Sequence, residues 1–219
     1  MKLKVVKNIL EANERLALSN RQRFEEAGVF VINLMSAPGA GKTSLLEKTL
    51  TKLNSRLKIG VIEGDITGTE DAERLARFGI PVVQINTQGA CHLDANMIGE
   101  VLDEIPLKEL DILFIENVGN LVCPAEFSVG EDRKVMLLSI TEGDDKPSKY
   151  PLMFRESSVL LINKIDLLPY LDVKIERIKM DSLMINPSLR IFEVSCRTEQ
   201  GLDQWTAWLL SEAERKNKK

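Results

Sequence analysis

The chain has 219 residues, a formal net charge of −4, 44% hydrophobic residues and 28% charged residues. This balance is typical of a globular protein with one α/β domain, and the negative charge excludes an electrostatic surface for nucleic acid. No apolar run reaches the length of a membrane span and no signal-peptide core is found, so we expect a cytoplasmic protein without membrane contact. Three cysteines are too few for a disulfide framework, which leaves packed residues, reactive thiols or metal ligands.

A charged segment at residues 5–27 comes first and predicts one long helix. Short apolar runs then alternate with longer amphipathic stretches. Most runs are almost continuously apolar, as expected of strands buried on both faces of a parallel sheet. The predicted strands are 29–35, 57–62, 81–85, 111–116, 135–140, 158–163 and 189–194. The predicted helices between and after them include 43–54, 69–78, 92–104, 171–184 and 201–215.

This alternation predicts an α/β fold with a doubly wound, mostly parallel sheet of about seven strands and right-handed crossovers. Ligands of such sheets bind beyond the carboxyl ends of the strands, so the loops that follow strands are the places to search for function. Trp205 and Trp208, in the last predicted helix, are expected to pack in the core.

A glycine-rich turn, S-A-P-G-A-G-K-T-S, joins the first predicted strand to a helix and resembles a Walker A P-loop. Glycines let backbone N–H groups surround a phosphate, and the helix N-terminus adds its positive end. Lys42 is placed to reach the β- and γ-phosphates, and Thr43 to bind Mg²⁺. Ser36 stands where the consensus has its first glycine. The predicted nucleotide-binding residues of this turn are Pro38, Gly39, Ala40, Gly41, Lys42, Thr43 and Ser44.

The sequence N-K-I-D closes a later strand and matches the N-K-x-D motif of GTPases. Asp166 can accept hydrogen bonds from N1–H and the 2-amino group of guanine, and adenine has no such pair of donors. Lys164 is expected to lie along the base and Asn163 to tie this loop to the P-loop. The loop after the last strand adds three nucleotide-binding candidates, namely Ser195, Cys196 and Arg197.

Two carboxylates follow strands between these motifs. Glu116, with Gly119 three residues later, resembles the D-x-x-G motif with Glu in place of Asp, so Glu116 is predicted to hold Mg²⁺ and Gly119 to sense the γ-phosphate. Asp65 is predicted either to orient the attacking water or to help hold Mg²⁺; Asp71 is expected to cap a helix. Lys42, Asp65 and Glu116 are the predicted catalytic residues. No glutamine follows Gly119, which predicts slow intrinsic turnover.

Cys91 and His92 are adjacent, and His92 is the single histidine of the chain. Cys123 follows the fourth predicted strand, so its loop and the loop of Cys91 are expected at the same edge of the sheet. Thiolates and imidazole suit Zn²⁺ and Ni²⁺ better than Mg²⁺, and three ligands leave one position for water or a second subunit. From the residues alone, a buried cysteine beside a helix-start histidine is the alternative. Cys196 is interpreted as a small apolar filler.

As a set, these motifs resemble the HypB family of nickel-incorporation GTPases from about residue 27 onward. The stretches that carry the resemblance are SAPGAGKTSLLE, EGDITGTEDAERL, NTQGACHLDA, FIENVGNLVCPAEFSVGE, TEGDDKPSKYP, NKIDLLP and SCRTEQGLD. The resemblance implies an N-terminal helix at 1–27 and a P-loop GTPase domain at 28–219. It also implies a nickel or zinc site at Cys91, His92 and Cys123.

The resemblance further implies a GTP-dependent homodimer that delivers nickel to the large-subunit precursor of nickel–iron hydrogenase, together with a metallochaperone of the HypA type. Some family members carry an N-terminal cysteine-rich or histidine-rich nickel motif, and this chain has neither. Because Cys123 lies four residues beyond Gly119, a γ-phosphate-dependent shift of that loop would move a metal ligand. Lys146 or Lys149 is a candidate to reach the nucleotide of a second subunit.

Three other functions remain open at this point. A P-loop kinase of a small molecule is one of them, although Asn163 and Asp166 count against it. The urease accessory GTPases also handle nickel, but their Cys-Pro-His motif corresponds here to Cys123, Pro124 and Ala125. A regulatory GTPase without a metal task would leave Cys91 and Cys123 without any effect on metal content.

Overall fold

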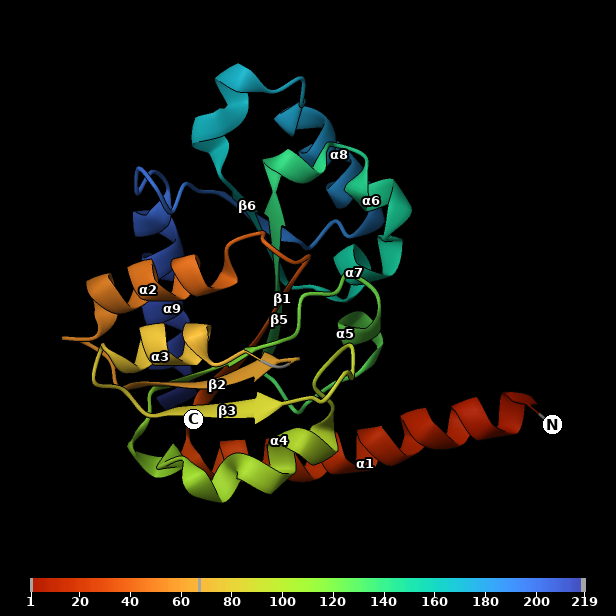
Figure 1. Ribbon diagram of the computed structural model, residues 1–219, viewed down its shortest axis with the longest axis vertical. Helices are drawn as coiled ribbons and strands as arrows, with labels where there is room; N and C mark the ends of the chain where they lie inside the picture. The colour runs from red at the N-terminus through yellow and green to blue at the C-terminus, as the bar shows by residue number, and fades with distance from the viewer. Residues whose placement is uncertain (1, 67, 218–219) are drawn as a thin grey trace.

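The computed structural model of the chain describes residues 2–66 and 68–217. Its centre is a seven-stranded sheet in the order β3-β2-β4-β1-β5-β6-β7, and every strand pairing is parallel (Figure 1). The strands are β1 Phe30–Ser36, β2 Ile59–Asp65, β3 Val82–Asn86, β4 Ile112–Glu116, β5 Arg133–Ser139, β6 Val159–Asn163 and β7 Arg190–Glu193. The predicted doubly wound parallel sheet is therefore confirmed.

The longer helices occupy the predicted stretches: α1 Lys2–Ala27, α2 Lys42–Leu53, α3 Glu70–Ala76, α4 Ala95–Val101, α8 Ile175–Ile185 and α9 Leu202–Asn217. Three short helices were not predicted, namely α5 Cys123–Glu126, α6 Lys146–Lys149 and α7 Pro151–Glu156. The 3₁₀ turns are η1 Leu102–Glu104, η2 Leu107–Glu109, η3 Ile140–Glu142 and η4 Ile165–Tyr170. The short helices each have a proline in the first turn and are too brief to show a helical apolar period.

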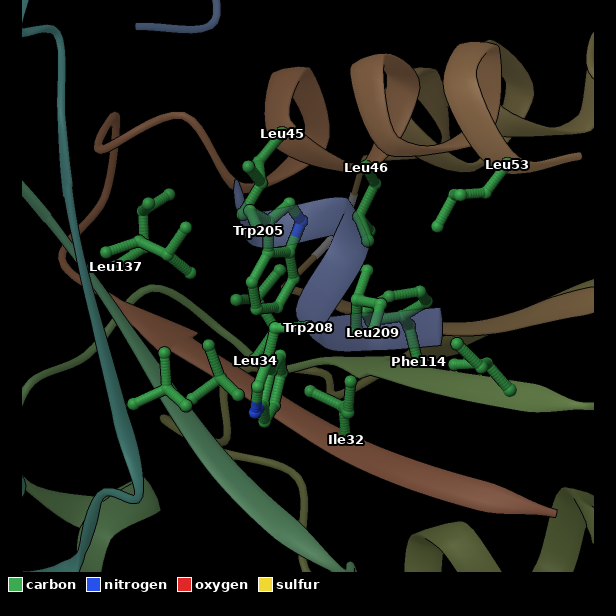
Figure 2. Close-up of a cluster of buried hydrophobic side chains, with 14 of the residues drawn as sticks. Ile32, Leu34, Leu45, Leu46, Leu53, Phe114, Leu137, Trp205, Trp208 and Leu209 are labelled. Carbon is green, nitrogen blue, oxygen red and sulfur yellow. The ribbon is translucent and has the colours of Figure 1, made fainter. Parts of the chain in front are cut away.

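Successive strand residues face opposite layers of helices. Ile32 of β1 belongs to a core cluster with α2 and α9, whereas Val31 belongs to a cluster with α1 and α4. Figure 2 shows the first cluster, in which Trp205 and Trp208 of α9 stack with ring centroids 5.2 Å apart. Both tryptophans are buried, and Trp205 Nε1 donates to Thr49 Oγ1 at 3.0 Å. Their predicted packing in the core is confirmed.

Helix α1 runs beside α4, and its amino-terminal end extends past the edge of the sheet (Figure 1). The carboxyl-terminal part of α1 is anchored, because Phe24 is 1% exposed within the core cluster shared with α4. Among the described residues, no helix combines the length and apolar character needed to cross a membrane.

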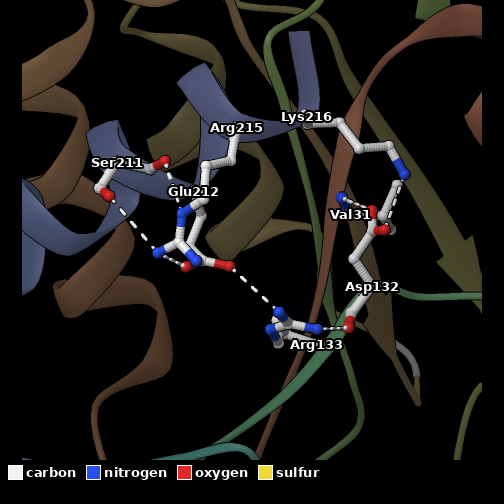
Figure 3. Close-up of polar contacts among 7 residues, drawn as sticks. All are labelled: Val31, Asp132, Arg133, Ser211, Glu212, Arg215 and Lys216. Atoms are coloured by element: carbon white, nitrogen blue, oxygen red, sulfur yellow. Dashed lines mark hydrogen bonds and ion pairs between the residues drawn. The ribbon is translucent and has the colours of Figure 1, made fainter. Parts of the chain in front are cut away.

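The amino ends of the central strands carry an ionic network (Figure 3). Glu212 of α9 is 7% exposed and pairs with Arg133 at 3.3 Å and with Arg215. Asp132 accepts from Lys216 Nζ at 2.7 Å and from the backbone N–H of Val31 at 2.9 Å. The network ties the end of α9 to the first residues of β1 and β5.

The order of the strands determines where a ligand would bind. From β1 the chain builds one side of the sheet with β2 and β3, returns to place β4 beside β1, and then builds the other side with β5, β6 and β7. The loop after β1 therefore lies at the switch point between the two halves, where ligands of doubly wound sheets bind.

Candidate nucleotide and metal site

The P-loop spans residues 37–41 between β1 and α2. Gly39 and Gly41 have φ of 72° and 104°, a left-handed backbone that favours glycine. A Cβ at Gly41 would lie 2.7 Å from Asn163 Nδ2, so this position also needs glycine for space. Ser36, at the variant consensus position, is the last residue of β1, and its hydroxyl accepts from Lys42 Nζ at 3.3 Å. Serine at this position is thus compatible with the turn.

The predicted base-side loop packs directly on the P-loop. Asn163 Nδ2 donates to Ala40 O at 2.9 Å, and Lys164 Nζ donates to Gly39 O at 2.8 Å. The Asp166 carboxylate accepts from Ser195 Oγ at 2.6 Å, which fixes its orientation. The predicted tie between Asn163 and the P-loop is therefore present.

A cavity of about 360 Å³ opens between these two loops. Its lining includes Gly41, Ser44, Lys164, Asp166, Cys196 and Arg197. Burial raises the pKa of the Cys196 thiol to about 11, so this cysteine stays protonated at neutral pH. It contributes a small, uncharged surface to the wall, as its interpretation as a filler requires.

Two buried carboxyl groups lie side by side beneath the P-loop. Glu116 of β4 is 2% exposed, and its Oε1 accepts from Thr43 Oγ1 at 2.9 Å. Glu63 of β2 is 3% exposed and is the register partner of Glu116. Burial raises the pKa of Glu63 to about 8, and the negative charge of Glu116 adds to this effect. Burial also raises the pKa of Glu116 to about 7, although the positive charge of Lys42 acts in the opposite direction.

Among the residues that the structure describes, the Oε2 atoms of Glu63 and Glu116 are both buried without a hydrogen-bond partner. Unpartnered carboxylate oxygens beside a P-loop hydroxyl are the donor set that a hard divalent cation such as Mg²⁺ accepts. The residues therefore fit the predicted magnesium site. Glu63 was missed from the sequence because the predicted strand ended at residue 62, whereas β2 continues to Asp65 and buries Glu63. The available signal was a carboxylate directly after an apolar run.

Asp65 ends β2, and its carboxylate holds the following turn. It accepts from the backbone N–H of Ile66 at 2.6 Å and of Gly68 at 3.0 Å. The expected capping role of Asp71 is wrong. Helix α3 starts at Glu70 after Thr69, so Asp71 lies inside its first turn and accepts from Arg74 at 2.9 Å.

The structure brings Cys91, His92 and Cys123 together, with their potential ligand atoms all within 4.8 Å of one another. The two Sγ atoms lie 3.2 Å apart, and Cys91 Sγ lies 3.5 Å from His92 Nδ1. Cys91 is exposed and Cys123 is half-buried, so the cluster opens to solvent. This donor set is suited to Zn²⁺ or Ni²⁺.

Local structure positions each member of the cluster. The helix predicted from residue 92 begins only at Ala95, because Asp94 is its N-cap and accepts from Met97 N at 2.9 Å. His92 therefore lies in a loop, where its ring packs on Phe127 at a centroid distance of 4.2 Å. Burial lowers the pKa of His92, which favours the neutral imidazole that a metal requires. The pKa of Cys123 is raised by its hydrogen bond with Cys91 and by burial.

Comparison with known proteins identifies the family. Residues 30–193 match the family described as CobW/HypB/UreG, nucleotide-binding domain. The hydrogenase maturation factor HypB of Azotobacter vinelandii is 49% identical over 207 residues, which cover 94% of this chain and 68% of that protein. The chain belongs to the HypB family.

Solved HypB structures have the same fold as this HypB-family chain. The crystal structure of hydrogenase maturation factor HypB from Archaeoglobus fulgidus matches with a TM-score of 0.88 and 40% identity, covering 93% of this chain and 99% of that one. HypB from Helicobacter pylori in complex with nickel also has a TM-score of 0.88, with 36% identity and coverage of 93% and 96%. The resemblance to the HypB family and the P-loop fold are thus confirmed.

Proposed function

We propose that this protein is a GTP-hydrolysing metallochaperone whose nucleotide state controls dimerisation and nickel delivery in the maturation of nickel–iron hydrogenase. One observation carries this proposal: a cluster of two thiols and an imidazole lies on the loops next to the predicted γ-phosphate sensor. Cys123 is four residues beyond Gly119 in the same connection after β4. Family membership, and the nickel bound by the related protein of H. pylori, support the assignment.

The choice of GTP is supported by Asp166. Its carboxylate lines the cavity beside the P-loop and is oriented by Ser195, as reading the two donors of guanine requires. Lys164, Cys196 and Arg197 form the adjoining wall. An adenine base would leave the Asp166 carboxylate without donors in this cavity.

Thr43, Glu116 and Asp65 are proposed to hold Mg²⁺, which would neutralise charge developing on the phosphates. Lys42, at the first position of α2, is proposed to stabilise the β- and γ-phosphates electrostatically. Glu116 already accepts from Thr43 and keeps one oxygen unpartnered, and we add Glu63 as a carboxyl group that faces the same ion. Because no glutamine follows Gly119 to position water, we propose slow intrinsic turnover.

Nickel is proposed as the cargo, with zinc as an ion that the same ligands accept. Three ligands leave a coordination position open, and an exposed Cys91 allows the ion to be exchanged with solvent or a partner. We propose that a HypA-type metallochaperone and the hydrogenase large-subunit precursor are the partners, in the cytoplasm. Lys146 and Lys149 pair with Asp145 within one subunit, and we propose that one of them reaches the nucleotide of a second copy.

The test is a nickel titration combined with a measurement of molecular size, in the presence of GDP or of a non-hydrolysable GTP analogue. The analogue is expected to produce dimers and a nickel Kd different from that with GDP. Cys123→Ala is expected to weaken nickel binding by at least about 100-fold, beyond the losses seen for outer-shell changes. Cys196→Ala is the matched control and should bind nickel as the wild type does.

Equal nickel affinity of the GDP and analogue complexes would contradict coupling between nucleotide and metal. Unchanged nickel binding by both Cys91→Ala and Cys123→Ala would instead support a regulatory GTPase without a metal task.

A further inference from the structure

Asn117, the residue after Glu116, is fully buried and joins three parts of the molecule. Its Oδ1 accepts from the backbone N–H of Leu93 at 2.9 Å and from that of Val118 at 3.0 Å. Its Nδ2 donates to Asn33 Oδ1 of β1 at 3.0 Å. Leu93 follows His92 directly, so this side chain connects the loop after β4 to the loop that carries two candidate metal ligands.

The loop after β4, residues 117–122, is also held against the P-loop. A Cβ at Gly119 would lie 2.9 Å from Pro38 Cα and 3.0 Å from Pro38 N, so the two backbones are in contact. At its other side, Asn120 Nδ2 donates to Cys91 O at 3.2 Å. The 117–122 loop therefore touches the phosphate-binding turn and the 87–94 loop at the same time.

We infer that Asn117 is the positioning residue that couples the γ-phosphate to the metal ligands Cys91 and His92. This route is distinct from the direct chain connection between Gly119 and Cys123, and it reaches the two candidate ligands that lie in the 87–94 loop. The inference rests on the proposed function, in which Gly119 senses the γ-phosphate and the cluster binds nickel.

The physical reason is that the Asn117 amide is shut off from water, which could otherwise replace a lost partner. It is 0% exposed, and its neighbour Asn33 has a buried Nδ2 that is already unpartnered. If the 117–122 loop shifts, the amide must either carry Leu93 with it or leave the Leu93 N–H unpaired in the interior, which is unfavourable. A shift of Leu93 moves His92, the adjacent residue. A change of nucleotide and a change in the geometry of the metal ligands would then both follow from one movement of the 117–122 loop.

A second asparagine provides the matched control. Asn13 of α1 is 7% exposed and bonds to the same two connections, the one before α4 and the one after β4. Its Oδ1 accepts from Ala95 N at 2.9 Å, and its Nδ2 donates to Ser128 O at 2.8 Å. It supports both metal-bearing connections but has no bond to the 117–122 loop. Loss of Asn13 should therefore change the metal site equally in both nucleotide states.

The experiment measures the nickel(II) Kd of the full chain with GDP and with a non-hydrolysable GTP analogue, both in the presence of Mg²⁺. The ratio of the two values is the coupling factor, and by linkage nickel must change analogue affinity relative to GDP by the same factor. We expect a wild-type factor in the range of about 5- to 150-fold. For Asn117→Ala we expect it to fall at least about threefold, with the remainder carried by the direct connection from Gly119 to Cys123, and for Asn13→Ala to stay at the wild-type value even where both Kd values rise.

Asn117→Ala leaves Asn33 without a partner, so the double variant Asn33→Leu, Asn117→Leu is prepared as well. It removes both buried amides together, which is gentler on folding than removing one, and it is expected to show the same loss of coupling. A wild-type coupling factor in the Asn117 variants would overturn the inference, as would an equal loss of coupling in Asn13→Ala. A wild-type factor of one would instead show that the proposed coupling itself is absent, before any variant is considered.

Discussion

We call the side of the sheet where the strands begin its amino edge and the side where they end its carboxyl edge. Buried carboxyl groups are paired at the first and lack partners at the second. At the amino edge, Glu212 pairs with Arg133 and Arg215 (Figure 3). At the carboxyl edge, Glu63 and Glu116 adjoin each other, and each keeps an oxygen without a hydrogen-bond partner in the part of the chain that the structure describes. An unpaired buried carboxylate is unfavourable to folding, so the difference separates an edge that stabilises the fold from an edge that we propose binds a cation and phosphates.

The carboxyl edge should lose function rather than stability when Asp166 is changed. Asp166→Asn keeps an oxygen that accepts from Ser195 but presents an amide N–H₂ to the base. We expect GTP affinity to fall by about 10⁴-fold, and xanthosine triphosphate, which has a carbonyl in place of the 2-amino group, to recover binding. Competition binding measures both, and Asp172→Asn, an exposed residue nearby, is the control. Unchanged preference for GTP would remove Asp166 from base recognition.

Substitution of Glu63 measures how far a buried carboxyl group at the carboxyl edge lowers the free energy of unfolding. Its folded pKa of about 8 is raised above the ordinary 4.5, so the stability present below pH 4.5 is lost as pH rises through 8. The loss is on the order of 5 kcal/mol above pH 8 without divalent cations. Urea unfolding with a chelator should show this loss for the wild type and a flatter profile for Glu63→Gln.

The exposed Glu14→Gln is the control for this series and should follow the wild-type pH profile. Addition of Mg²⁺ is expected to reduce the wild-type loss because a cation supplies the missing counter-charge. Parallel pH profiles for the wild type and Glu63→Gln would show that burial does not raise the pKa of Glu63.

Lys42 carries the positive charge that opposes the raised pKa of both Glu63 and Glu116. Lys42→Ala is expected to lower single-turnover GTP hydrolysis by about 10²–10³-fold, because a fixed charge on the phosphates is removed. Lys52→Ala, at the far end of the same helix and paired with Asp203, is the control and should hydrolyse GTP normally. Equal rates for Lys42→Ala and the wild type would exclude this electrostatic contribution.

The smallest effect is expected at the amino edge. Glu212→Gln should lower the free energy of unfolding by about 1–2 kcal/mol, less than for a fully buried pair, because its arginine partners are partly solvated. The side chains of Arg133 and Arg215 are 43% and 62% exposed. Glu25→Gln breaks the exposed pair with Arg21 and should change stability by less than about 0.5 kcal/mol. GTP hydrolysis should be unaffected in both variants. A loss of GTP hydrolysis in Glu212→Gln would show that the amino edge also contributes to function, contrary to the comparison made above.

Much of the fold could be predicted because its signals are local. Each strand is an apolar run, and the turn around Gly41 and the N-K-I-D sequence are contiguous patterns. Helix ends were less predictable: residues 92–94 fit a helical pattern, but the cap by Asp94 starts α4 at Ala95 and leaves His92 in a loop. The short α5, which begins at Cys123, has no periodicity to detect.

The sequence by itself determined the strand and helix pattern, the phosphate turn, the N-K-I-D motif and the adjacent pair of Cys91 and His92, since these depend on residues near one another in the chain. Cys123 joined that pair only through the expected order of the strands and the family resemblance, because it lies 32 residues from Cys91. Tertiary structure alone decided that Glu63 lies beside Glu116 and that Asn117 connects to Leu93. Both depend on which strands are neighbours and in what register, and parallel strands are paired across long connections that no local pattern encodes. For the same reason, the bonds of Asn13 to Ala95 and Ser128, which brace the two connections that carry the candidate metal ligands, were not visible in the sequence.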